Sequence, residues 1–504
     1  MNTQHLKFSF SILLTLIYNY FFWQESWGIN ILLFTFLLIG CQFILYKESF
    51  RSPKVLIVLT GTLLSAAMVC IHSSDTSKFT FTCSLILLTG FIHQPDLRSV
   101  HAAILTALTG IVQASANYTD ILKSRKTKQP LFPVILIFLR LAILPLIVLT
   151  VFYWIYKFAN PLFYKASSEF WDHLGNFMAG IVDNISFSWL LFFISGIFII
   201  TGMLFNRNIL KFLNSDLSGN DQLRRKGKKI KKIYVHSLIA LKNEYRTGLL
   251  IILSVNILLV IVNAIDIKWI WFNFNYKEVP DMSALVHEGT YLLIFSIILS
   301  MLLLLYFFRG NLNFYKNNHL LKTAAIVWIA QNFILALSVG IRNYHYINHY
   351  GIAYKRIGVI VFLILTMFGL ITMVVKIRKR YSDYYLFRIN SWAVYLMMIL
   401  ISCINWDRTI AAYNLNHPER QNIDILFILN LSDKTLDILY ENQSFFDDPV
   451  IYQFNRYYHS SGDAKLQLKE RIQLFKKKYP QRSWLSWNLA EYNTYQYLIN
   501  NDIK

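Results

Sequence analysis

The sequence predicts an all-α polytopic transmembrane helical bundle of about 11 spans with a small C-terminal helical soluble domain. Three observations predict it. The chain of 504 residues is 55% hydrophobic and 15% charged, whereas a typical soluble domain is about 25% charged. Apolar stretches of spanning length recur up to residue 404. Residues 405–504 instead balance 12 basic against 12 acidic side chains, which is typical of a water-soluble part.

Each predicted span has about 20 mostly apolar residues, the length that crosses a bilayer. The spans are 8–23, 29–46, 55–71, 78–93, 134–157, 187–205, 248–265, 289–308, 323–341, 357–375 and 388–404. Residues 99–115 are apolar but short and rich in Ala, Thr and Gly, which favours an interfacial or re-entrant helix. The predicted domains are N-terminal membrane helices at 1–130, a main membrane domain at 131–404, and a helical extracytoplasmic domain at 405–504.

The basic residues predict the orientation. The net charge of +21 belongs to the part before residue 405, where Lys and Arg gather in alternate connections and most densely at 206–246. By the positive-inside rule these connections are cytoplasmic, so the N-terminus lies in the cytoplasm and the C-terminus outside. The predicted location is the bacterial cytoplasmic (inner) membrane. Few aromatic residues interleave the basic loop, so we expect membrane lipid and no nucleic acid as its partner.

The sequence predicts no metal and no cofactor. Its cysteines, Cys41, Cys70, Cys83 and Cys403, lie in or beside apolar stretches and are typical of small buried hydrophobic residues. The pair His287-Glu288 begins a motif similar to the metalloprotease HExxH, but position 291 is tyrosine, so the second histidine ligand is missing.

Polar residues at the predicted outer ends of spans seven to eleven form the candidate site. The stretch 342–356 departs from the positive-inside rule, because Arg342, Lys355 and Arg356 lie among tyrosines and histidines on the outer side. Ionisable groups at such depths are candidates for function, with internal pairing or an aromatic interfacial belt as alternatives. The candidate binding residues are Asp266, His287, Glu288, Arg342, His345, Tyr354, Arg356, Trp406 and Asp407. No catalytic residue is assigned.

Amide side chains also occur inside two spans. Asn256 and Asn263 are seven residues apart in span seven, and Gln331, Asn332 and Ser338 lie in span nine. A spacing of seven places both asparagines on one helix face. Hydrogen bonding between helices and ligand binding are equally compatible with this pattern.

Several motif blocks resemble one family. They are His287-Glu288-Gly289-Thr290, Arg342-Asn343-Tyr344-His345-Tyr346 with Gly351, Tyr354-Lys355-Arg356-Ile357-Gly358, and Asn405-Trp406-Asp407, together with Asn160-Pro161. In this set the chain resembles an uncharacterised bacterial multi-pass membrane-protein family of the domain of unknown function 4173/4153 type. The resemblance implies a membrane location and no established activity.

Three functions remain open. The first is binding or moving an anionic or lipid-linked envelope ligand at the outward cluster. The second is a membrane-embedded enzyme acting on a lipid-linked substrate, with His287 or Glu288 as general base and Arg342 and Arg356 holding a phosphate or carboxylate. The third is a scaffold or sensor that uses 405–504 to bind a protein partner. No nucleophile motif supports the enzyme, and no repeated halves support transport.

The orientation gives a first prediction. A phosphatase reporter that is active only outside the cytoplasm, fused after residue 504, should be active because an odd number of spans separates the two ends of the chain. A fluorescent reporter that works only in the cytosol should be dark at the same position. The opposite pair of results would remove both the orientation and the outward site.

Overall fold

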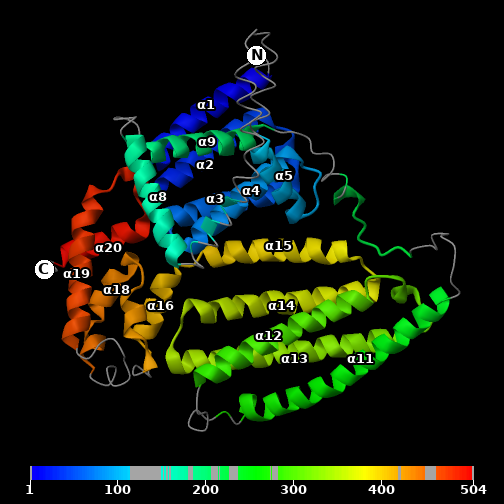
Figure 1. The fold of residues 1–504 in the computed structure, drawn as a ribbon. Coiled ribbons are helices and arrows are strands. Elements are labelled where there is room, and N and C mark those ends of the chain that lie inside the picture. The colour runs from blue at the N-terminus through cyan, green and yellow to red at the C-terminus, as the bar shows by residue number, and fades with distance from the viewer. Residues whose placement is uncertain are drawn as a thin grey trace. The chain divides into compact units, whose positions relative to one another are not determined.

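The computed structural model describes residues 3–113, 161–179, 186–205, 216–225, 236–272, 282–417, 422–448 and 461–501, with a few single positions between them. These residues are helices and their connections, without a named strand among them (Figure 1). The all-α prediction is therefore confirmed. The chain divides into two compact units: Met1–Leu217 with Arg482–Ala490, and Ser218–Gln481 with Glu491–Lys504.

The first unit contains seven described helices. They are α1 (Thr3–Phe22), α2 (Ile29–Leu45), α3 (Pro53–His72), α4 (Asp75–His93), α5 (Val100–Val112), α8 (Pro161–Ala179) and α9 (Phe187–Leu204). Side chains at one end of the unit fix their directions. Tyr46, at the end of α2, donates a 2.6 Å hydrogen bond to the carbonyl of Leu204, at the end of α9. The Lys7 ammonium, near the start of α1, lies 4.7 Å from the Tyr46 ring. Helices α2 and α9 therefore end where α1 begins.

The same end of the first unit also fixes the direction of α4. His93, which ends α4, hydrogen-bonds the Met203 carbonyl near the end of α9 at 3.1 Å. Helices α4 and α9 therefore finish at one face. Helix α5 has 13 residues, about 20 Å long, too short for a hydrocarbon core of about 30 Å. This length agrees with the interfacial or re-entrant prediction for 99–115. The predicted span at 134–157 lies mostly outside the described residues.

A late segment of the chain completes the other end of the first unit. Residues 482–490 lie beside the connection between α1 and α2, where the Ile29 amide donates to the Trp487 carbonyl at 2.9 Å. The Ser26 amide donates to the Ser486 hydroxyl at 2.8 Å, which in turn donates to Glu25 at 2.5 Å. One of the unpaired amides at the start of α2 is thereby satisfied. The segment lies at the face where α1 ends.

The second unit begins with five long helices, shown in Figure 1. They are α11 (His236–Asp266), α12 (Met282–Phe307), α13 (His319–Tyr350), α14 (Tyr354–Lys379) and α15 (Asp383–Ser402). Helix α11 continues as a π-helical turn at Ile267–Phe272. Helix α13 packs against α11, α12 and α14, and α15 packs against α14. A buried apolar cluster that includes Ile252, Leu304 and Trp328 joins them.

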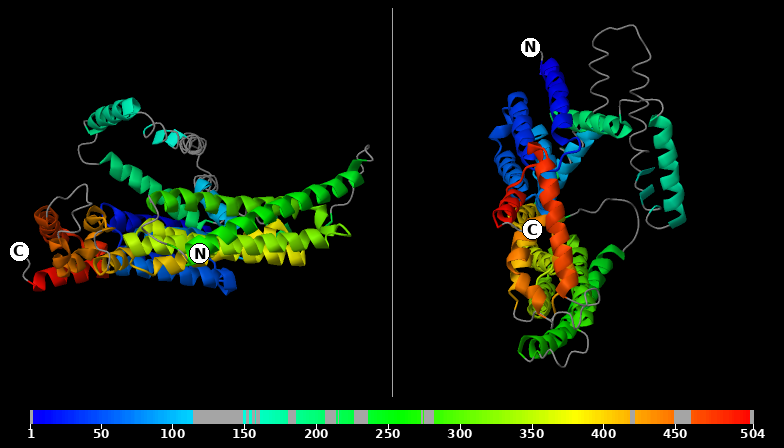
Figure 2. Two further views of the ribbon diagram at one scale, coloured as in Figure 1. Left: turned by 90° about the horizontal axis from the view of Figure 1, so that it is seen from below. Right: turned by 90° about the vertical axis from the view of Figure 1, so that its left-hand side faces the viewer.

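Helices α11 and α13 run in the same direction, side by side in both views of Figure 2. Along their interface the partners' numbers rise together: Gln331 donates to Asn256 at 2.7 Å, and Arg342 donates to Asp266 at 2.5 Å. Two parallel helices at one depth require a return path, which α12 supplies. Helices α14 and α15 are antiparallel, because Asn390 donates to Thr372 at 2.9 Å while Lys376 pairs with Asp383 at 3.1 Å.

The described residues after 405 form five α-helices, in agreement with the helical character predicted for this region. They are α16 (Trp406–Leu415), α17 (Ile425–Leu429), α18 (Leu436–Glu441), α19 (Ser461–Lys478) and α20 (Leu489–Asn500). Their core contains Ile410, Ile428, Phe446 and Leu468, all buried. Three-residue helical turns link them, including η10 at Trp484–Ser486.

Six described helices are long and apolar enough to cross a membrane. They are Pro53–His72, Phe187–Leu204, Leu241–Phe272, His319–Tyr350, Tyr354–Lys379 and Asp383–Ser402. Shorter apolar helices occur at Ile29–Leu45 and Tyr291–Phe307. The chain is therefore a membrane protein with several spans. The total of about 11 spans, the domain limits at 130 and 404, and a basic loop over 206–246 stay predictions.

The docking of 482–490 can be tested at Gly28. A methyl group there would lie 2.3 Å from the Trp487 carbonyl oxygen, and against Ser486 as well. Because backbone atoms cannot retreat like a flexible side chain, Gly28→Ala should release this segment and expose it to limited proteolysis. Gly40→Ala, within α2 and with nothing within 4 Å of the added methyl group, is the control. Equal cleavage in the two variants would contradict the docking.

Candidate functional site

The candidate site contains a buried ion pair between α11 and α13. Arg342 donates to Asp266 at 2.5 Å, with side chains 11% and 7% exposed. A guanidinium and a carboxylate with so little water are retained only when they pair. One oxygen of Asp266, Oδ2, and the Nε of Arg342 have no further partner within the described part of the chain. Arg342 therefore stabilises the bundle interior and does not face outward.

Helix α13 is longer than the predicted span 323–341. It continues to Tyr350 and ends at Gly351, whose φ of +74° is a backbone conformation that glycine adopts readily because it has no Cβ. Two features let it continue: Arg342 is neutralised inside the bundle, and His345 reaches the Ile270 carbonyl at 3.1 Å. The stretch 342–350 is therefore helix, and only 351–353 forms the connection.

Arg356 holds this connection together. Its Nη1 donates to the carbonyl of Tyr350 at 2.7 Å and also to that of Gly351. The guanidinium lies 4.3 Å from the centre of the Tyr346 ring, a cation–π distance. The guanidinium thus satisfies carbonyls that the end of α13 leaves unpaired, and Asn343 donates to the Arg356 carbonyl at 3.1 Å.

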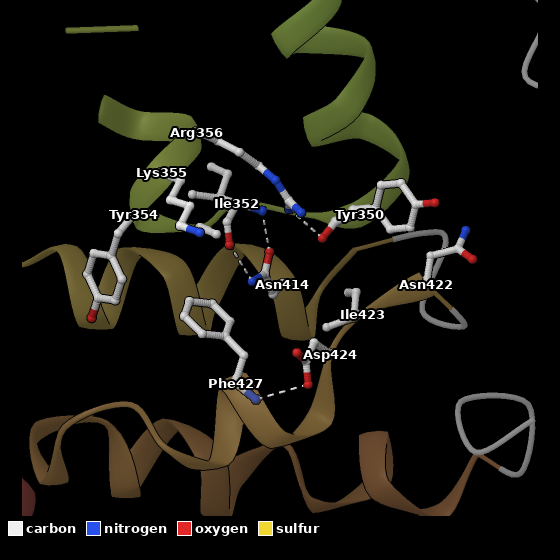
Figure 3. Close-up of a pocket in the computed structure, with 11 residues that line it drawn as sticks. Tyr350, Ile352, Tyr354, Lys355, Arg356, Asn414, Asn422, Ile423, Asp424 and Phe427 are labelled. Atoms are coloured by element: carbon white, nitrogen blue, oxygen red, sulfur yellow. Dashed lines mark hydrogen bonds between the residues drawn. The ribbon is translucent and has the colours of Figure 1, made fainter. Parts of the chain in front are cut away.

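The connection is bound to the C-terminal helices. Asn414 on α16 accepts from the Ile352 amide at 2.7 Å and donates to the Ile352 carbonyl at 2.8 Å (Figure 3). The Tyr354 hydroxyl donates to Asp407, which also accepts from Ser432. The motif blocks within 342–358 therefore meet the distant block at 405–407 at the start of α14.

A cavity of about 410 Å³ lies at this junction. Its lining comes from the α13–α14 connection and from α16 and α17: Tyr350, Ile352, Ala353, Tyr354, Lys355, Arg356, Asn414, Asn422, Ile423, Asp424 and Phe427 (Figure 3). Aromatic walls with a few polar groups are typical of small-molecule sites. Lys355 is exposed and has no ion-pair partner within the described residues. The cavity combines a lysine and an arginine with aromatic rings, a composition suited to an anion that has an apolar portion.

The structure separates the nine candidate residues into groups. Asp266 and Arg342 form the buried pair, and His345 stacks on Phe274 at 4.1 Å. Tyr354 and Arg356 line the cavity. Asp407 binds Tyr354, while Trp406 donates to the Ile401 carbonyl at 3.0 Å and closes the end of α15. The side chains of His287 and Glu288 lie outside the described residues.

Sequence reasoning missed most of the cavity lining. Asn414, Asn422, Asp424 and Phe427 belong to the region predicted as a separate soluble domain, and no motif marks them. Lys355 had a signal, since it adjoins Arg356 in a motif block. Among the described residues, no group of three or more His, Cys, Asp or Glu side chains could hold a metal ion.

A comparison with known protein families covers the same motif blocks. A model described as Domain of unknown function (DUF4153) matches residues 13–442. The chain belongs to the DUF4153 family. This membership confirms the suspected resemblance and assigns no activity to its residues. The match includes the buried pair and the whole cavity, and it ends before α19. No curated protein and no solved structure matches the chain.

The buried pair gives a stability prediction. Asp266→Ala leaves Arg342 charged, buried and unpaired, so the free energy of unfolding should fall by about 3–5 kcal/mol. Thermal unfolding in detergent, followed by tryptophan fluorescence, measures the change. Lys268→Ala removes an exposed charge two residues away and should cost under about 0.5 kcal/mol. If both variants unfold alike, Arg342 does not depend on Asp266.

Proposed function

We propose that this DUF4153 protein binds an anionic, lipid-linked headgroup in the cavity where the α13–α14 connection meets α16 and α17. The observation that carries the proposal is the lining: Lys355 and Arg356 beside Tyr350, Tyr354 and Phe427. Cations recognise phosphate or carboxylate groups, and the rings accept the apolar part of the ligand. Lys355 and Arg356 lie in the first turn of a candidate span, a depth suited to a headgroup.

The proposed setting is the bacterial cytoplasmic membrane, with the N-terminus in the cytoplasm and the cavity on the outer side. The helix directions support this orientation. In the second unit α11 begins, and α14 ends, at the face that carries Arg378, Lys379 and Arg380, whereas the cavity lies at the opposite ends. Basic residues favour the cytoplasmic side. In the first unit, Lys47, Arg51 and Lys54 follow the end of α2, opposite the docked segment 482–490.

A scaffold function is a second candidate, and the pairing of the cations favours it. Arg342 pairs with Asp266, and Arg356 donates to two backbone carbonyls. In this alternative the cluster braces helices, and the region after 405 binds a protein partner. The membrane-embedded enzyme has no comparable support, since the described cavity lining lacks a paired nucleophile and base.

The lipid proposal is tested by calorimetric titration of the full-length protein in neutral detergent with dihexanoyl phosphatidylglycerol. Lys355→Gln should weaken binding about tenfold, since a charge-assisted hydrogen bond contributes roughly 1.5–3 kcal/mol. The matched control is Lys379→Gln, an exposed lysine at the other end of α14, which should bind as the unmodified protein does.

Two results would contradict the proposal. One is equal loss of affinity in Lys355→Gln and Lys379→Gln, which would indicate charge attraction without a site. The other is equal affinity for dihexanoyl phosphatidylcholine, which has no net charge. Either result would leave bracing as the function of the cluster.

A further inference from the structure

The interface between α11 and α13 is a polar seam, defined here by Asn256, Asn263, Gln331, Ser338, Asp266 and Arg342. Its hydrogen bonds run along both helices: Gln331 donates to Asn256 at 2.7 Å, Asn263 donates to the Gln331 carbonyl at 3.1 Å, and Trp271 donates to Ser338 at 2.9 Å. All six residues come from candidate spans. Neighbouring helices in a membrane use such bonds as links, but a link does not need more polar groups than it pairs.

The polar seam has more polar atoms than partners. Side-chain atoms without a hydrogen-bond partner within the described residues are Asn263 Oδ1, Gln331 Oε1, Asp266 Oδ2 and Arg342 Nε, joined on the same helix α13 by Asn332 Oδ1 and Trp328 Nε1. The side chains are deeply buried, with Asn263 5% and Trp328 1% exposed. In a bilayer core each unsatisfied group costs several kcal/mol. Four such atoms in one interface, with two more on the same helix α13, indicate a ligand that belongs there.

The chemistry of these atoms selects the ligand. Four are oxygens that accept, and two are N–H groups that donate. A desolvated cation would satisfy the oxygens and leave the N–H groups unpaired, and the Arg342 charge would repel it. Water both donates and accepts, and buried waters typically make about three hydrogen bonds to groups of this kind.

The two ends of the polar seam differ: one is bordered by polar side chains and the other by apolar ones. On α11 it extends from Asn256 to Asp266, a step of ten residues or about 15 Å along the helix. At the end near the cavity face, α11 turns π-helical over Ile267–Phe272, a distortion common at functional sites. Beyond Asn256 the core contains Ile252 of α11, Leu321 of α13 and Leu304 of α12, all fully buried.

From these observations we infer that the α11–α13 seam is a hydrated half-channel. It takes up a file of water molecules from the face where α11 ends, with the Asp266–Arg342 pair at its mouth. The apolar residues beyond Asn256 seal its inner end. The inference is independent of the lipid-binding proposal, because it uses a different interface and a different ligand.

Radiolytic hydroxyl-radical labelling in lipid nanodiscs tests the half-channel. X-ray pulses generate the radicals from water where it resides, so even a narrow file of water oxidises its neighbours. Mass spectrometry of the full-length protein should find Trp328 oxidised at least about tenfold faster than the equally buried Phe308 on the sealed side. The exposed Trp484 reports the radical dose.

Two variants make the comparison direct. Phe308→Trp places the same ring on the sealed side and should stay unoxidised. Gln331→Leu removes polar atoms from the seam and should lower oxidation of Trp328 at least about fivefold, while Trp484 is unchanged. If Phe308→Trp does not fold, native Phe308 remains the reference. Oxidation of Trp328 no faster than that of the sealed-side reference would overturn the half-channel.

Discussion

Polar side chains that lie in the hydrocarbon core of a membrane need hydrogen-bond partners, and this requirement determines how the helices of the second unit are arranged. Water is scarce there, so Asn256, Gln331 and the Asp266–Arg342 pair must satisfy one another across helices. These contacts fix α11 and α13 as parallel neighbours with one register, because sliding one helix by a turn would break all of them together. Apolar packing alone tolerates such sliding, since lipid tails are as apolar as leucine.

From this parallel pairing the rest of the topology follows. If α11 and α13 both cross in one direction, α12 must return between them, and antiparallel α14 and α15 then place residue 405 on the side where α11 ends. The same reasoning in the first unit makes α2, α4 and α9 run in one direction. Helix directions and basic residues are independent observations, and both support the proposed orientation.

The sequence was sufficient for the long apolar helices, although not for α8, and it was insufficient for the contacts between helices. Hydropathy located ten of the eleven predicted spans on described helices, because burial in lipid requires long apolar stretches whatever the neighbours are. Contacts were different. Asp266 and Arg342 are 76 positions apart, and nothing in either helix specifies the other. The length of α13 was also underestimated, since a charged residue ends an apolar pattern even when a buried partner lets the helix continue.

The cavity is a second example of contacts that the sequence alone does not specify. Its lining joins a connection between two spans to α16 and α17, and a division of the chain at residue 404 separates these parts. In the sequence pattern of α16, nothing distinguishes Asn414 from any other polar residue of an amphipathic helix. Its two hydrogen bonds to Ile352 become visible only when α16 lies against that connection. Short-range patterns therefore located Tyr354 and Arg356, and only the fold added Asn414 and Asp424.

In the proposed orientation, three cations of α13 and α14 lie on the outer side, and their contacts account for this departure from the positive-inside rule. Arg342 is neutralised by a buried carboxylate, so it adds no net charge to that side. Arg356 is held by carbonyls and a tyrosine ring, and it completes a helix end. Lys355 alone is exposed to the cavity without an ion-pair partner among the described residues. An apparent excess of outward charge thus reduces to two structural cations and one that is available to a ligand, and the binding proposal depends on that one.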